Sequence, residues 1–105
     1  MTPPGSPSGI ARLEAIVHGR VQGVGFRYYT RRLANGLGVR GWVANEPSGA
    51  VRVVAEGPRA ALERMLDGLR DGPPGAFVER IDEAWPAPSG TFGAFEVRSG
   101  WHGGD

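Results

Sequence analysis

The sequence contains neither cysteine nor lysine. The lack of cysteine excludes disulfide bonds, a thiolate nucleophile and cysteine-based metal sites, and it favours a reducing compartment, so we expect the cytoplasm. All twelve basic residues are arginines and stand against eleven Asp and Glu residues, which leaves a formal net charge of +1. A charge this small argues against a broad basic surface for nucleic acid or an anionic membrane. Any anion site must therefore be local.

Long apolar segments are also missing. No apolar run approaches the roughly 18 residues needed to span a bilayer, and the N-terminus lacks the basic and apolar regions of a signal peptide. A chain of 105 residues has room for one domain with one core. We predict a disordered tail at residues 1–10, one domain at residues 11–98 and a loose C-terminal tail at residues 99–105. A monomer is the default expectation for so small a domain.

The spacing of apolar residues predicts the secondary structure. Alternation favours strands at residues 12–17, 39–45, 50–56 and 77–85, with a short last strand within residues 92–98. Helical spacing favours helices at residues 26–37, ending at Gly38 as a left-handed C-cap, and at residues 58–71, with Pro58 in the first helical position.

The order of elements, β-α-β-β-α-β with an added strand, predicts the fold class. Right-handed crossovers place both helices on the same face of one sheet. The result is an α+β, ferredoxin-like sandwich with an antiparallel sheet and a short extra C-terminal strand. Period two puts Asn45 on the same side of its strand as Gly41 and Val43, opposite Trp42. Many unrelated activities share this fold, so function depends on a site.

The segment GRVQGVG, residues 19–25, joins the first strand to the first helix and holds three glycines. Glycine tolerates positive φ, so neighbouring N–H groups can converge on an anion just before a helix N-terminus that favours phosphate. Arg27 lies in the first turn of that helix, where a cation is disfavoured unless an anion binds nearby. The segment is therefore either an anion-binding nest completed by Arg27 or a tight glycine loop beside a solvated arginine.

Asn45 ends the second strand and is either a turn-capping residue or a side chain that orients water, since its amide both donates and accepts. The other polar candidates fit better as structural residues. We expect His18 to be hydrogen-bonded or peripheral, Arg20 to be solvated, and Tyr28 and Tyr29 to pack. No group of His, Asp and Glu has metal-ligand spacing, so neither a metal nor another cofactor is predicted.

Together the motifs GRVQGVGFR, residues 19–27, and GWVANEPSGAV, residues 41–51, resemble the acylphosphatases, small βαββαβ hydrolases of carboxyl-phosphate mixed anhydrides. The resemblance runs from about Leu13 to Val97, and Ala44 departs from the basic or polar residue of many members. It implies that Arg27 binds the phosphoryl group with the loop amides and that Asn45 positions the attacking water. The phosphate-binding residues that it implies are Gln22, Gly23, Val24, Gly25, Phe26 and Arg27.

The chemistry of acyl phosphates agrees with these motifs. A carboxylate is a good leaving group, because its conjugate acid has a pKa of about 4, so no general acid is needed. The loop contains no Asp or His, and a carboxylate there would repel the phosphate. The expected partners are an acyl phosphate as substrate and inorganic phosphate as product.

The alternative is a non-catalytic ferredoxin-like module that binds an anion or nucleic acid. RNA-recognition domains of this topology stack bases on aromatic residues of the central strands, and residues 51–56 contain none. A module taken from a larger maturation protein is a further possibility, but the length of the chain and its two loose ends favour a separate enzyme.

Overall fold

The structure is a computed structural model that describes residues 9–99. Most of the two predicted tails, residues 1–8 and 100–105, lies outside this range. The elements follow the predicted order, including the short last strand: β1 (Ile10–Arg20), α1 (Phe26–Leu37), β2 (Arg40–Asn45), β3 (Val51–Pro58), α2 (Arg59–Asp71), β4 (Phe77–Ala84) and β5 (Glu96–Arg98).

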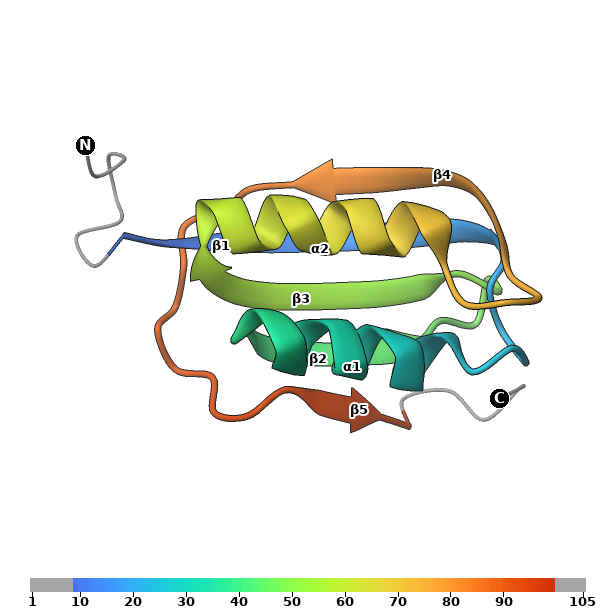
Figure 1. Cartoon of the computed structure of the whole chain (residues 1–105), viewed down its shortest axis with the longest axis horizontal. Helices are drawn as coiled ribbons and strands as arrows, with labels where there is room; N and C mark the ends of the chain where they lie inside the picture. The colour runs from blue at the N-terminus through green and yellow to red at the C-terminus, as the bar shows by residue number, and fades with distance from the viewer. Residues whose placement is uncertain (1–8, 100–105) are drawn as a thin grey trace.

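One five-stranded sheet with the order β4-β1-β3-β2-β5 forms the back of the molecule, and both helices cover the same face of it (Figure 1). This arrangement confirms the predicted ferredoxin-like α+β fold. The prediction of a wholly antiparallel sheet was wrong, because β5 pairs with β2 in parallel. The reason is the connection after β4, which crosses one end of the sheet and brings the chain to the opposite edge with its direction reversed (Figure 1).

The core lies between the sheet and the helices. Leu13, Ala15 and Val17 of β1 are fully buried, which confirms the predicted alternation. The predicted apolar stripe of α2 is buried as well and consists of Leu62, Met65, Leu66 and Leu69. Burial of each such side chain stabilises the fold by about 1.5–3 kcal/mol. This packing fixes both helices on the sheet and so determines where the first turn of α1 lies.

Several predicted boundaries differ from the structure, most clearly those of β1 and the start of α2. β1 is longer than residues 12–17, and it already begins at Ile10, which pairs with Pro58 of β3. Pro58 is not in the first helical position of α2, because its ψ of 140° is extended and the helix begins at Arg59. Gly38, in contrast, is the left-handed C-cap of α1 as predicted, with φ 71°. Within residues 9–99, neither helix is long and apolar enough to cross a membrane.

Candidate active site

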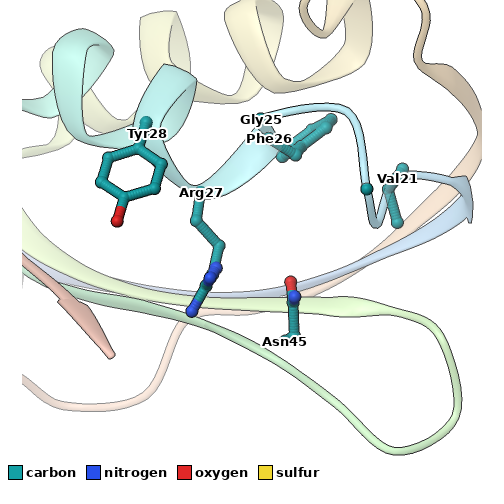
Figure 2. A pocket seen from close by; sticks show the side chains of 7 residues that line it. Val21, Gly25, Phe26, Arg27, Tyr28 and Asn45 are labelled. Atoms are coloured by element: carbon teal, nitrogen blue, oxygen red, sulfur yellow. The ribbon is translucent and has the colours of Figure 1, made fainter. Parts of the chain in front are cut away.

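A pocket of about 200 Å³ opens where the loop between β1 and α1 meets the end of β2. In Figure 2, Arg27 extends from α1 toward the strands, and Asn45 extends from the end of β2 into the space beside Arg27. The two predicted catalytic candidates therefore line one pocket although they are far apart in the sequence. The described residues that line it are Val21, Gly23, Gly25, Phe26, Arg27, Tyr28 and Asn45.

The loop depends on two glycines with left-handed backbone conformations. Gly23 has φ 77°, and Gly25, the N-cap of α1, has φ 76°. A Cβ atom at Gly25 would meet no other atom within 4 Å, so glycine is needed there for its conformation and not for space. Left-handed residues directly before a helix N-terminus let successive N–H groups face one anion.

Gly19 does not belong to this loop, although the sequence suggested it. β1 continues to Arg20, and Gly19 pairs with Val78 of β4 after a shift in the strand register. A Cβ atom at Gly19 would overlap the backbone carbonyl of Phe77. This glycine therefore allows the close approach of two strands, and the anion loop is limited to residues 21–25.

Arg27 is buried in the pocket wall, with 5% of its surface exposed. Its Nη1 atom donates a hydrogen bond of 2.7 Å to the backbone carbonyl of Arg98 in β5. Arg98 lies opposite Ala44 in the register, directly before the position of Asn45 in β2. β5 thus holds the guanidinium near Asn45. This contact could not be predicted from the sequence, since any residue presents a backbone carbonyl.

Asn45 is the last residue of β2 and is 4% exposed. Gly41 and Val43 are buried and Trp42 is half-buried, which agrees with the predicted side of the strand. The turn that follows is closed by backbone groups, because the N–H of Glu46 donates to the carbonyl of Ala50 over 2.9 Å. The Asn45 side chain lines the pocket.

Gln22 connects the loop to the β2–β3 hairpin. Its Nε2 atom donates to the carbonyls of Glu46, at 2.8 Å, and Ala50, at 3.0 Å. The side chain therefore holds the hairpin that carries Asn45, and it is not among the groups that line the pocket. Val24 packs against the hydrophobic core instead of facing the pocket. Of the predicted loop residues, the pocket brings together Gly23, Gly25, Phe26 and Arg27.

The two tyrosines of α1 differ. Tyr29 packs as predicted, because its hydroxyl donates to the carbonyl of Gly68 over 2.7 Å and its ring meets Phe26 edge-on. Tyr28 was also predicted to pack, but it is 48% exposed and lines the pocket. The sequence feature that could have indicated this place in the pocket is the position of Tyr28 directly after Arg27, in the first turn of the helix.

His18 and Arg20 lie outside the residues that line the pocket. His18 Nε2 is hydrogen-bonded to Asp82 Oδ2 at 2.8 Å, as the sequence suggested, and this bond lowers the pKa of the exposed Asp82 carboxyl. Arg20 is exposed. The described part of the pocket wall carries no carboxylate and no imidazole, so its polar side-chain groups are those of Arg27, Asn45 and the Tyr28 hydroxyl.

A buried arginine and asparagine beside a glycine loop at a helix N-terminus form a candidate anion site on a ferredoxin-like fold. The acylphosphatase family model matches residues 13–97. An acylphosphatase of Salinibacter ruber is 49% identical over 87 residues, which are 83% of this chain and 92% of that protein. The chain belongs to the acylphosphatase family, as the motifs suggested. It is a hydrolase of small acyl phosphates that releases a carboxylate and inorganic phosphate.

Solved structures agree with this assignment. The crystal structure of an acylphosphatase from Bacillus subtilis has a TM-score of 0.82 and 34% identity, and the match covers 84% of this chain and 98% of that one. HypF of T. kodakarensis has a TM-score of 0.75 and 31% identity over 85% of this chain, but the match covers 12% of that larger protein. The fold is thus similar both to a small acylphosphatase and to a segment of a larger protein.

Proposed function

We propose that Arg27 and the backbone amides at residues 22–27 bind the phosphoryl group of the acyl phosphate, while Asn45 orients the attacking water. The observation that carries this proposal is the meeting of two buried polar side chains, Arg27 and Asn45, in one pocket at the N-terminus of α1. Each comes from a different element, α1 and β2. Burial of such groups is costly unless they are hydrogen-bonded or serve a ligand.

The phosphoryl group would lie between the loop amides and Arg27. The guanidinium can donate parallel N–H bonds to two phosphate oxygens, and the N-terminus of α1 adds its partial positive charge. Both interactions strengthen as negative charge spreads over the oxygens in the transition state. The carbonyl of Arg98 orients the guanidinium before substrate binds, so little reorganisation accompanies the reaction.

Asn45 would bind water through its side-chain oxygen or nitrogen and direct it at phosphorus. The water oxygen forms a bond to phosphorus while the bond between phosphorus and the acyl oxygen breaks. The proton of the water passes to a phosphate oxygen, and the electron pair leaves with the carboxylate. The leaving group needs no proton, which agrees with a described pocket wall that lacks Asp, Glu and His.

A nucleic-acid-binding module has less support. The uncovered face of β1 and β3 presents Arg12, Glu14, Ile16 and His18 on β1, together with Arg52 on β3. The imidazole of His18, which is hydrogen-bonded to Asp82, is the one ring in this set, and none of these residues is Phe, Tyr or Trp. Three expectations stay predictions: that the protein has no nucleic-acid partner, that it is a monomer and that it lies in the cytoplasm. Light scattering on the purified protein tests the monomeric state.

The test is the hydrolysis of benzoyl phosphate in the presence of a metal chelator. We expect the wild type to turn over, and we expect Arg27→Ala and Asn45→Ala each to lower kcat by at least about 100-fold, the scale of one lost transition-state contact. Arg32→Ala is the matched control, because Arg32 is an exposed arginine of the same helix, and it should keep full activity.

Each component of the proposal can fail separately. Near-normal turnover by Arg27→Ala or Asn45→Ala would remove the role given to that residue. Loss of wild-type activity with chelator would contradict metal-independent catalysis. Among residues 9–99, no group of three or more His, Asp or Glu side chains is placed to hold a metal ion, so added Mg²⁺ should not raise kcat.

A further inference from the structure

Two large apolar side chains are exposed among residues 9–99: Tyr28, at 48%, and Phe77, at 63%. Phe77 lies at the start of β4 and does not line the pocket, whereas Tyr28 does. Packing in the core accounts for neither ring. An exposed aromatic ring at the edge of a substrate pocket is suited to contact whatever part of the ligand extends out of it.

The pocket has a polar base and an aromatic rim. Arg27 and Asn45 are 5% and 4% exposed, so they lie deep, while Tyr28 lies where the pocket opens to solvent. In Figure 2, Tyr28 and Asn45 lie on opposite sides of Arg27. If the phosphoryl group lies at the polar base, an acyl group that extends along the exposed Tyr28 ring gains an apolar contact, because the other large side chains of the lining are buried.

The Tyr28 ring has a neighbour that limits its movement. The guanidinium carbon of Arg31, one turn further along α1, lies 5.2 Å from the ring centroid in a cation–π contact. Arg31 covers one side of the ring and leaves the remaining exposed surface to a ligand. A ring with few rotatable bonds and a supporting neighbour loses little conformational entropy when it binds a second apolar group.

We propose that Tyr28 is a specificity-determining residue that binds the acyl group and selects acyl phosphates with aromatic or large apolar acyl groups over acetyl phosphate. This inference rests on the proposed function, because it takes the position of the phosphoryl group from Arg27 and the loop. The contact involves the ring, since stacking and apolar burial do not require the hydroxyl. Acetyl phosphate has too little apolar surface to gain from it.

The test compares benzoyl phosphate with acetyl phosphate in the wild type, Tyr28→Ala, Tyr28→Phe and the control Phe77→Ala. We expect Tyr28→Ala to raise KM for benzoyl phosphate by about 3- to 10-fold, the effect of one aromatic contact, with a smaller change for acetyl phosphate. Tyr28→Phe should behave as the wild type because it keeps the ring. Phe77→Ala removes an exposed ring outside the pocket and should change the kinetics of neither substrate.

Inhibition by inorganic phosphate separates this role from damage to the phosphate site. Tyr28→Ala should keep the wild-type inhibition constant for phosphate. Equal losses for both substrates, no loss for either, or a loss in Tyr28→Phe as large as in Tyr28→Ala would overturn the proposal. Failure of the proposed function looks different, because then the wild type hydrolyses neither substrate or Arg27→Ala keeps its activity.

Discussion

Two buried polar clusters lie at opposite ends of the sheet. One contains Arg27 and Asn45, where Asn45 pairs with Val51 at the start of β3. The other contains Glu56, near the end of β3 and 5% exposed, where it pairs across the sheet with Arg12. In Figure 1 the loop between β1 and α1 marks the first end, and the connection from β4 to β5 marks the second.

The Glu56 carboxylate accepts hydrogen bonds from other groups of the protein. Its Oε2 accepts from Arg12 Nη1 at 2.9 Å and from the N–H of Ser89 at 2.7 Å, while its Oε1 accepts from the N–H of Gly90 at 2.9 Å. These bonds attach the β4–β5 connection to the sheet. A hollow of about 290 Å³ beside Glu56 is larger than the 200 Å³ pocket at Arg27. Size alone therefore does not identify the functional end.

The position of Arg27 at one end of the sheet depends on the chain segment that Glu56 holds at the other end. The connection that Glu56 holds leads to β5, and β5 presents the Arg98 carbonyl to Arg27. Phe95 is buried and Val97 packs against the core, so β5 is fixed along its length. The hydrogen bonds of Glu56 hold the β4–β5 connection, and β5 at the end of this connection accepts the hydrogen bond from Arg27, the proposed phosphate-binding residue. Substitutions at the two ends should therefore have different effects.

The largest expected effect is on activity. Arg27→Lys keeps the charge but loses the planar fork of donors, so we expect kcat with benzoyl phosphate to fall by about 10²- to 10³-fold. The free energy of unfolding should change much less. Steady-state kinetics and urea denaturation on the same samples measure both quantities. Arg32→Lys is the control. Wild-type turnover by Arg27→Lys would contradict the claim that the Arg27 end of the sheet serves activity and the Glu56 end serves stability.

The reverse pattern is expected at the other end. Glu56→Gln loses a buried charge that accepts several hydrogen bonds, so we expect it to lower the free energy of unfolding by about 2 kcal/mol at neutral pH. For a domain of this size that corresponds to a Tm lowered by about 10 °C. The folded variant should retain most of its kcat. Glu63→Gln, at an exposed carboxylate of α2, is the control.

The same variant has a distinct pH dependence. Burial alone would raise the pKa of Glu56, but the N–H groups of Ser89 and Gly90 and the Arg12 guanidinium more than offset it, so the pKa lies below its ordinary 4.5. Between the two values the unfolded chain binds more protons, so this stabilisation falls as the pH drops below 4.5. Denaturation at several pH values should show the gap between wild type and Glu56→Gln narrowing there. A constant gap would contradict the assignment.

A smaller effect is expected at Gln22, which links the anion loop to the hairpin of Asn45. Gln22→Ala removes the bonds to Glu46 and Ala50, worth about 1 kcal/mol, and should lower kcat by about 3- to 10-fold through displacement of Asn45. Ser48→Ala is the control, because the Ser48 hydroxyl accepts from Ala50 N within the same turn. An effect of Ser48→Ala as large as that of Gln22→Ala would mean that any loosening of the hairpin suffices.

The sequence predicted the element order and the two main site residues because each leaves a local pattern. The periodicity of apolar residues predicted the strands and helices, and the paired motifs indicated Arg27 and Asn45 as candidate site residues. The parallel pairing of β5 could not be predicted, since three residues carry little pattern and their partner depends on a long connection. The contact of Arg27 with the Arg98 carbonyl was hidden for the same reason.

Some structural roles could not be predicted from the sequence. The predicted place of Gln22 in the phosphate loop stays a prediction, and its sequence position gave no sign that its side-chain amide donates to the hairpin. Gly19 was assigned to the nest because a glycine required by close strand packing looks the same in a sequence as one required by a loop. Tyr28 differs from Tyr29 only in the direction of its side chain, which the position on the helix decides.

The most direct test of the account is a titration of the wild type, Arg27→Ala and Asn45→Ala with inorganic phosphate by calorimetry. The account predicts that Asn45→Ala binds phosphate as the wild type does although it has lost turnover, because Asn45 serves the water. Arg27→Ala should bind phosphate at least about 100-fold more weakly, since it lacks the main charged contact. Equal weakening in both variants, or undiminished binding by Arg27→Ala, would contradict the separate roles of the two residues.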